Sequence, residues 1–177
     1  MKASLWVAAW ILFGSALAFG QAKLPMAKAE LHNSQGELVG IATFTEGSNG
    51  VKIVAHVRNL SPGYRGFHIH EVGKCDPPDF ASAGEHFNPY ESSHGLADPK
   101  GPHAGDLPNL LVAPDGTGVI VTESMLLTLG EGKNSLFHPN GTALVIHVHA
   151  DDHRTDPSGK AGDRLACGVI SRGSPTR

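Results

Sequence analysis

Apolar and polar residues alternate along most of this chain in short stretches that turn residues separate. Residues 51–58 show it best, because Val51, Ile53, Ala55 and Val57 occupy every second position. Side chains alternate between the two faces of a β-strand, so this spacing predicts a strand with one buried face. Glu-Gly-Ser-Asn-Gly at 46–50 precedes the stretch and Ser-Pro-Gly at 61–63 follows it, and both are typical of turns.

Seven further stretches have β-type composition or alternation. They are residues 27–31, 38–45, a stretch that ends at 70, 110–113, 118–123, 143–148 and 165–171. Short strands at this spacing, each bounded by turn residues, predict an all-β sandwich or barrel. We find no internal repeat and no linker, so we expect one domain.

Two segments lack this pattern. Residues 71–107 and 150–163 are rich in Gly, Pro, His and Asp and have no periodicity. A structureless loop as long as the first is rare in a compact domain unless it is functional. Something other than a hydrophobic core must therefore order it.

The first twenty residues resemble an export leader. Met1-Lys2 gives a positive start, residues 5–13 are apolar, and small residues suit cleavage near 18–22. An uncleaved anchor is the alternative, but the apolar run is short for a membrane span. We therefore expect a signal peptide at 1–20 and a single domain at 21–177.

The charge balance argues against two classes of partner. The full chain has 14 basic and 17 acidic residues, and loss of Lys2 with the leader changes the net charge from −3 to −4. A mildly acidic chain without a basic stripe is not expected to bind nucleic acid, and no amphipathic helix indicates a membrane surface.

Cys75 and Cys167 are the only cysteines. In an exported chain such a pair is expected to form a disulfide. Two free thiols or two soft metal ligands are the alternatives, and the even count together with the leader favours the disulfide.

Histidines form two candidate metal groups. His86, His94, His103 and Asp106 lie within one loop and make a ligand set that zinc accepts tetrahedrally, with all four positions filled by protein as in structural sites. Histidines on a loop surface that bind no ion are the alternative.

His68 and His70 share one face of the strand that ends at 70, and an imidazole-rich site suits Cu(II). Either His147 or His149, from the strand-like residues 144–149, can join them, and the pattern alone leaves this choice open. The remaining histidines, His32, His56, His138 and His153, are interpreted as surface or turn residues.

Four segments resemble signature segments of the copper/zinc superoxide dismutases, in the right order. They are Gly66-Phe67-His68-Ile69-His70, residues 82–89 (Ser-Ala-Gly-Glu-His-Phe-Asn-Pro), residues 103–110 (His-Ala-Gly-Asp-Leu-Pro-Asn-Leu) and residues 162–170 (Gly-Asp-Arg-Leu-Ala-Cys-Gly-Val-Ile). The similarity spans residues 27–171, and the leader resembles the exported bacterial branch. It implies a Greek-key, eight-stranded β-sandwich or flattened barrel with two long functional loops.

The resemblance also implies a role for each site residue. It implies one copper and one zinc ion per subunit, a catalytic Arg164 that guides the anion, and a catalytic His86 that bridges the metals. The other implied roles are copper binding by His68, His70 and His147, zinc binding by His94, His103 and Asp106, a carboxylate of Asp151 that contacts a histidine of each site, and the Cys75–Cys167 disulfide.

The implied reaction is disproportionation of superoxide to dioxygen and hydrogen peroxide, in the periplasm or outside the cell. We expect superoxide as substrate, no nucleic-acid partner and no stable membrane insertion after leader cleavage, with monomer and homodimer both open because the spacing around Cys75 differs from that of the animal enzymes. A metal-storage protein, a copper-only dismutase and an adhesive domain are the rival functions. Asn140-Gly141-Thr142 matches a glycosylation sequon and is interpreted as a turn.

Overall fold

Residues 26–173 are described by the computed structural model of the chain, and their regular structure is almost entirely β. The elements are β1 (Met26–Asn33), β2 (Leu38–Gly47), β3 (Gly50–Val57), β4 (Gly63–Arg65), β5 (Phe67–His70), η1 (Ala81–Ala83), β6 (Leu110–Val112), β7 (Gly118–Ser124), β8 (Ala143–His147), β9 (Arg164–Val169) and β10 (Ser171–Arg172). This confirms the all-β prediction. No helix in this part of the chain is long and apolar enough to cross a membrane. The predicted leader lies outside the described residues.

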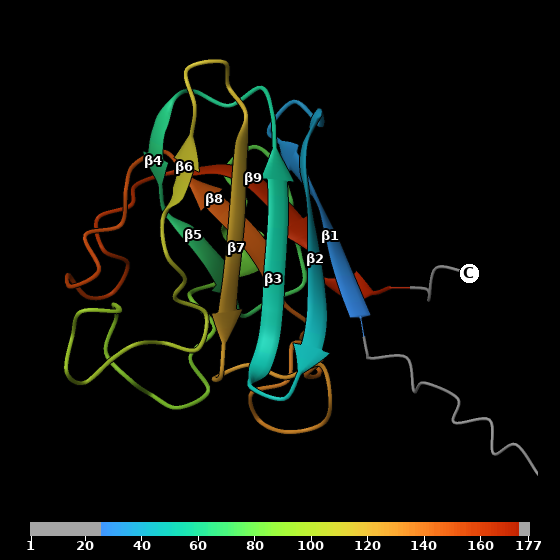
Figure 1. Cartoon of the computed structure of the whole chain (residues 1–177), viewed down its shortest axis with the longest axis vertical. Helices are drawn as coiled ribbons and strands as arrows, with labels where there is room; N and C mark the ends of the chain where they lie inside the picture. The colour runs from blue at the N-terminus through green and yellow to red at the C-terminus, as the bar shows by residue number, and fades with distance from the viewer. Residues whose placement is uncertain (1–25, 174–177) are drawn as a thin grey trace, which may run out of the picture.

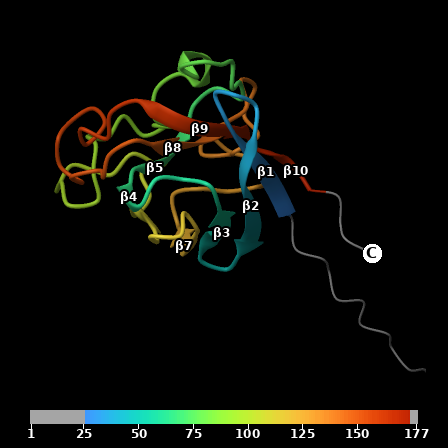
Figure 2. The same cartoon turned by 90° about the horizontal axis from the view of Figure 1, so that it is seen from above.

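The strands form one antiparallel sheet that nearly closes on itself. Their order is β4-β6-β7-β3-β2-β1-β9-β8-β5, and β10 pairs with β1. The two ends of this order, β4 and β5, are consecutive in sequence, with Gly66 alone between them. The sheet therefore curls into a flattened barrel (Figures 1 and 2). The chain crosses between distant strands from β3 to β4 and from β7 to β8, as in a Greek key.

Two of the eight predicted strands are each divided, which accounts for the ten strands. At Gly66 the backbone N–H donates to the carbonyl of His149 (2.7 Å) and the carbonyl accepts from the N–H of His147 (2.9 Å). The chain thus changes partner there, from β6 to β8. Near the C-terminus, Ile170 donates to the carbonyl of Thr142 (3.0 Å) and separates β9 from β10.

The core follows the alternation seen in the sequence. Val51, Ile53, Ala55 and Val57 of β3 are all buried. Strands β5 and β8 differ, because every residue in them is buried. Their inward side chains join the core, and their outward side chains lie beneath the two long loops, which run side by side outside the barrel (Figures 1 and 2). This covered outer face carries the polar residues of interest.

A disulfide joins Cys75 of the first long loop to Cys167 of β9, as predicted. It packs beside a small apolar cluster that includes Phe80, Ala83 and Val145. The cluster ties the start of the loop to the outer face of β8 and β9. The loop is therefore fixed at one end before any metal is considered.

Candidate metal centre

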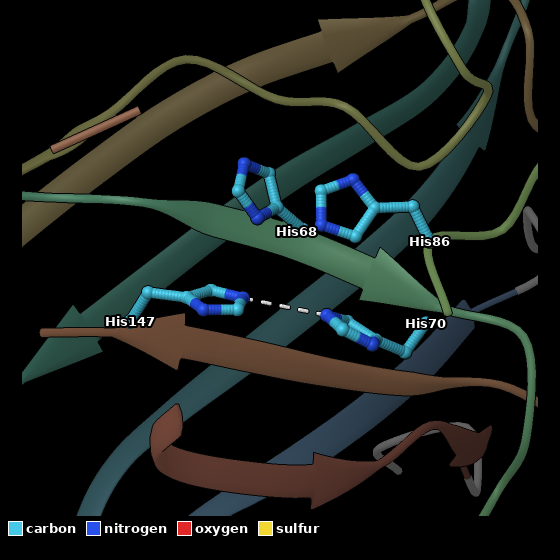
Figure 3. A group of neighbouring side chains, drawn as sticks. All are labelled: His68, His70, His86 and His147. Atoms are coloured by element: carbon cyan, nitrogen blue, oxygen red, sulfur yellow. Dashed lines mark hydrogen bonds between the residues drawn. The ribbon is translucent and has the colours of Figure 1, made fainter. Parts of the chain in front are cut away.

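Four buried histidines converge on the outer face of β5 and β8. His68 and His70 project from β5, His147 stands at the end of β8, and His86 arrives from the first long loop (Figure 3). Each offers a ring nitrogen, and these atoms all lie within 4.8 Å of one another. We call this group the four-histidine set.

In three of these rings one nitrogen makes a hydrogen bond away from the other histidines, and this bond fixes which nitrogen faces the space that the four rings surround. Nδ1–H of His70 donates to the carbonyl of Gly84, and Nδ1–H of His147 donates to the carbonyl of Gly162, both at 2.9 Å. A neutral imidazole carries one hydrogen, so Nε2 of each keeps its lone pair, and the two Nε2 atoms lie 3.4 Å apart. His68 is turned the other way, because its Nε2–H donates to Asp151 and leaves Nδ1 free.

A backbone irregularity separates His147 from His149. The pairing of β8 with β9 shifts register between Ile146 and His147. Beyond it the backbone N–H of His149 donates to Ala161 (2.9 Å), and its side chain is exposed. The structure therefore places His147, and not His149, in the four-histidine set.

A second group lies in the first long loop. Nδ1 of His86, His94 and His103 lies 2.8, 3.1 and 3.3 Å from Oδ1 of Asp106. The other oxygen, Oδ2, accepts the backbone N–H groups of Gly95 (2.8 Å) and His103 (3.0 Å). These two bonds hold the carboxylate so that Oδ1 faces the three rings. We call this group the His3Asp set.

His86 belongs to both sets. Its Nδ1 faces Asp106, while its Nε2 is buried on the other side of the ring beside the four-histidine set. The centroid of its ring lies 4.2 Å from that of His68. One imidazole thus offers one nitrogen to each set.

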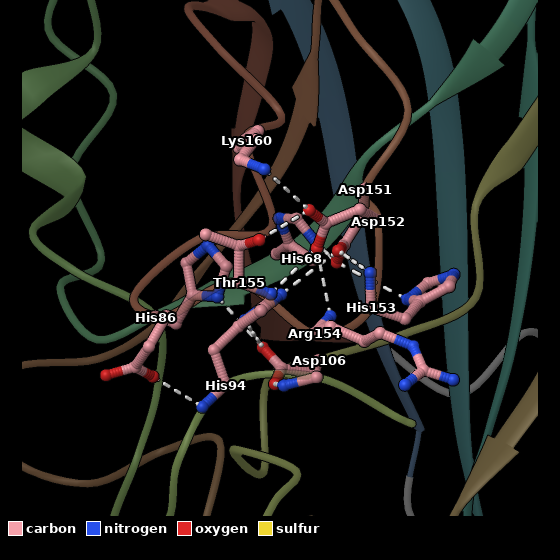
Figure 4. A network of polar contacts seen from close by, with 12 residues as sticks. His68, His86, His94, Asp106, Asp151, Asp152, His153, Arg154, Thr155 and Lys160 are labelled. Carbon is pink, nitrogen blue, oxygen red and sulfur yellow. Dashed lines mark hydrogen bonds and ion pairs between the residues drawn. The ribbon is translucent and has the colours of Figure 1, made fainter. Parts of the chain in front are cut away.

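Asp151 is a second link between the two sets, because its carboxylate contacts one histidine of each (Figure 4). Its Oδ2 accepts from Nε2 of His68 at 2.7 Å, and its Oδ1 accepts from Nε2 of His94 at 3.0 Å. Such outer partners fix the tautomer and orientation of metal-binding rings. Gly159 packs against this carboxylate at a φ of +60°, and a Cβ there would overlap Oδ1, so only glycine fits.

Burial and charge set the protonation of these groups. Burial lowers the pKa of His68 to about 3 and that of His147 to about 4, and it also holds the pKa of His70 well below its usual range. These rings are therefore neutral at physiological pH and keep a lone pair for a ligand.

In the His3Asp set the carboxylates dominate. Burial lowers the pKa of His94, but Asp106 and Asp151 together outweigh it and raise the pKa to about 9. Burial would raise the pKa of Asp106, yet the rings of His103, His86 and His94 beside its carboxylate hold it well below its usual range. The set thus contains a carboxylate that stays ionised.

Arg164 stands at the start of β9 beside the four-histidine set. Its guanidinium donates to the carbonyls of Phe80 (2.5 Å) and Gly84 (2.6 Å). Gly84 is also the acceptor for His70, so one carbonyl orients both residues. Burial lowers the pKa of Arg164 while Glu85 and Asp79 oppose this, and an arginine remains a cation at neutral pH. It lines a surface pocket of about 470 Å³ with Asp79 and Asp163.

Both sets satisfy the requirements of a metal site. Within the described residues, buried Nδ1 of His68, Nε2 of His86, and Nδ1 of His94 and of His103 make no hydrogen bond of good geometry. Buried polar atoms without partners are rare in proteins, and imidazole nitrogens are common metal ligands. Four imidazoles suit Cu(II), and three imidazoles with a carboxylate suit zinc.

Sequence reasoning missed two residues of this region. Asn109 contacts the backbone of Asp151, and His153, interpreted as a surface or turn residue, lies against both of them. An asparagine directly before a strand gives no signal of such a role. His153 follows Asp151 by two positions, which was the one available clue.

The comparisons with known proteins agree with this geometry. The family model described as copper/zinc superoxide dismutase matches residues 38–170. The Aquifex aeolicus protein named Cu-Zn superoxide dismutase 1 is 49% identical over 80% of this chain and 85% of its own length. The Bacillus subtilis superoxide dismutase-like protein YojM is 42% identical over 80% of this chain and 74% of its own.

A solved structure shows the same similarity in three dimensions. The crystal structure of a double mutant of a SOD-like protein from Bacillus subtilis aligns with a TM-score of 0.78 at 43% identity, over 80% of this chain and 95% of that one. Fold, site geometry, family model and relatives all agree. The chain belongs to the copper/zinc superoxide dismutase family.

Proposed function

We propose that this protein disproportionates superoxide, with one copper ion in the four-histidine set and one zinc ion in the His3Asp set. The observation that carries the proposal is His86, whose ring offers one nitrogen to each of two buried ligand sets. A site for copper alone would not need the second set. The two groups share a residue, which favours joint function.

The reaction oxidises one superoxide to dioxygen and reduces another, with two protons, to hydrogen peroxide. When bound, copper supplies the one-electron exchange, which zinc cannot because it has no redox chemistry. The protein has to attract the anion, orient it and deliver a proton.

In this proposal Arg164 orients the anion. Two backbone carbonyls hold its guanidinium beside the ring of His70, so its position does not depend on substrate. The mature chain is net negative by the count above, and its total charge therefore repels superoxide. Because screening acts over about 8 Å at physiological ionic strength, a fixed cation at the site outweighs distant carboxylates.

In this proposal His86 holds a proton for the reaction. Its Nε2 faces the four-histidine set, while Asp106 holds its Nδ1 side at 2.8 Å. The ring could therefore hold a proton on Nε2 whenever that nitrogen is not bound to metal, and give it to the reduced substrate without leaving its position. This assigns His86 both a ligand and a proton-transfer role.

We also propose that the protein works outside the cytoplasm, in the periplasm or beyond the cell, after removal of residues 1–20. The leader-like composition of those residues supports this, and so does the disulfide between Cys75 and Cys167. Disulfides persist in oxidising compartments and are rare in the cytosol. Mass measurement of the exported chain tests the cleavage position.

The activity is tested with four samples of residues 21–177: metal-free, zinc-loaded, copper- and zinc-loaded, and copper- and zinc-loaded then treated with a copper chelator. Superoxide decay is followed directly by stopped-flow absorbance. We expect fast decay in the third sample only. Metal uptake without faster decay in the third sample would instead favour a storage protein.

A further inference from the structure

We propose that Asn109 and His153 are positioning residues for Asp151, and through it for both metal sets. We call them the Asn109–His153 pair. The inference rests on the proposed function, because it concerns the carboxylate that links the two sets. It assigns a role to two residues that lie outside both ligand sets.

The side chain of Asn109 makes hydrogen bonds to both polar backbone atoms of Asp151, and we call this pair of bonds the clamp. The side-chain Oδ1 accepts the N–H of Asp151, and Nδ2 donates to the carbonyl of Asp151, each at 2.8 Å. A backbone N–H can only donate and a carbonyl can only accept, so the amide has one possible orientation. Asn109 comes from the end of the first long loop, three positions after Asp106, whereas Asp151 begins the second. The clamp therefore ties the two loops together at the carboxylate.

The same amide fixes the tautomer of His153. Its second Nδ2 hydrogen points to Nε2 of His153 at 3.1 Å. Because Asn109 can only donate from this atom, Nε2 must be the acceptor, and the ring hydrogen is on Nδ1. That Nδ1 is buried, makes no hydrogen bond within the described residues, and lies 3.5 Å from Oδ2 of Asp151. The ring thus presents a hydrogen to the carboxylate oxygen that also accepts from His68.

The backbone of His153 also contacts the carboxylate of Asp151. Its N–H donates to Oδ1 of Asp151 at 2.6 Å, and its φ of +57° turns the chain so that the ring folds back over the carboxylate. Each oxygen of Asp151 therefore faces one metal-site histidine and one hydrogen from His153 (Figure 4). The pair sets the position and rotation of the carboxylate, and these decide which nitrogens of His68 and His94 are left for metal.

The test measures metal affinity in four variants. Asn109→Ala removes the whole clamp, and Asn109→Asp keeps the acceptor but loses both donors. His153→Ala removes the ring, whereas His153→Asn keeps an amide donor near the position of Nδ1 and tolerates the positive φ. Asn33→Ala is the matched control, because Asn33 holds a tight turn by accepting the N–H groups of Gln35 and Glu37, both at 3.0 Å, away from the metal sets.

Zinc and copper dissociation constants are measured by chelator competition, with the absorption spectrum of the Cu(II) protein and the melting temperature of the metal-free protein. We expect Asn109→Ala to weaken zinc binding by about 10- to 100-fold, which is the usual cost of losing an outer partner of a metal ligand. His153→Ala should have a smaller effect in the same direction, with a shifted Cu(II) spectrum, and His153→Asn should restore both. Asn33→Ala should lower the melting temperature alone.

The inference is overturned if Asn109→Ala and His153→Ala resemble Asn33→Ala, with a lower melting temperature but metal affinities within twofold of the parent. It is also overturned if His153→Asn is no better than His153→Ala. Should Asn109→Ala fail to fold, the two His153 variants decide the question. None of these readouts uses superoxide, so an inactive parent protein would refute the proposed function and leave this test valid.

Discussion

Replacement of Asp151 by asparagine is the most informative single change in the site. The side chain keeps its size and loses its charge, and with it two charge-assisted hydrogen bonds, from His68 at 2.7 Å and from His94 at 3.0 Å. Hydrogen bonds to charged groups contribute about 1.5–3 kcal/mol and neutral ones about 0.5–1.5 kcal/mol. One histidine keeps a neutral hydrogen bond to the amide oxygen and loses on the order of 1–2 kcal/mol of orienting energy. The other faces the amide NH2, which cannot accept, and loses its hydrogen bond altogether.

The two metal sets should respond unequally. His68 stays in place without Asp151, because β5 is paired with β8 and the backbone of that strand does not depend on the carboxylate. His94 lies in an irregular loop, where its own backbone N–H is held by Asp156 at 2.6 Å. We expect Asp151→Asn to raise the zinc dissociation constant by about 10- to 100-fold, or about 1.4–2.8 kcal/mol. Copper affinity should fall by less than about tenfold, since a strand fixes its ligand.

The assay is competition with a chromophoric chelator, with Asp152→Asn as control. Asp152 carries the same charge one residue away and is exposed, where it accepts from Thr155 and contacts Lys160. Asp151 also raises the pKa of His94, so in the parent protein protons compete with zinc for that ring below about pH 9. Asp151→Asn relieves this competition, and zinc affinity is therefore measured above and below that pH. The variant should lose more zinc affinity above pH 9 than below it. Equal zinc affinities for the two variants at both pH values would refute the reasoning.

Three further predictions concern the anion, the pH dependence and the disulfide. Arg164→Ala should lower kcat/KM by about tenfold or more and flatten its salt dependence while both metals remain bound, and an unchanged kcat/KM would exclude Arg164 from substrate guidance. In the metal-free protein the pKa values of His68 and His147 are lowered, so the unfolded state takes up protons before the folded state does as pH falls below 6.5. The free energy of unfolding, measured by urea denaturation, should therefore fall by about 1.4 kcal/mol per pH unit for each ring, down to about pH 4. Equal free energies of unfolding at pH 7 and pH 5 would contradict this. Replacing Cys75 and Cys167 by serine opens a loop of sequence separation 92, and the chain-entropy model predicts that the free energy of unfolding falls by about 4–5 kcal/mol. Denaturant unfolding measures this change, and a fall of less than about 1 kcal/mol would contradict the prediction.

The strand pattern of this chain was accessible from sequence because its barrel buries one face of most strands. The alternation of Val51, Ile53, Ala55 and Val57 therefore marks both the strand and its inward side. The break at Gly66 was not accessible, because it depends on hydrogen bonds to His147, the last residue of β8, and to His149 just beyond it, both distant in sequence. Strand signals alone cannot reveal such a change of partner.

The candidate metal centre was likewise predictable only in part from the sequence. The spacing of His68 and His70 and the density of ligands around Asp106 indicated metal chemistry, and resemblance supplied the choice of His147. The structure shows what sets His147 apart: a register shift after Ile146 that leaves His149 exposed. Contacts made through the backbone, such as the grip of Asn109 on Asp151, carry no residue pattern that sequence analysis could detect.

The central claim is that copper held by the four-histidine set performs the reaction. The most direct measurement titrates copper into the zinc-loaded protein and follows the superoxide decay rate, in the parent chain and in His147→Ala and His149→Ala. We expect the rate to rise linearly to one copper per chain in the parent and in His149→Ala, whose lost side chain is exposed, and to stay low in His147→Ala. A parent protein that gains no activity with copper, or equal activity in the two variants, would contradict the account.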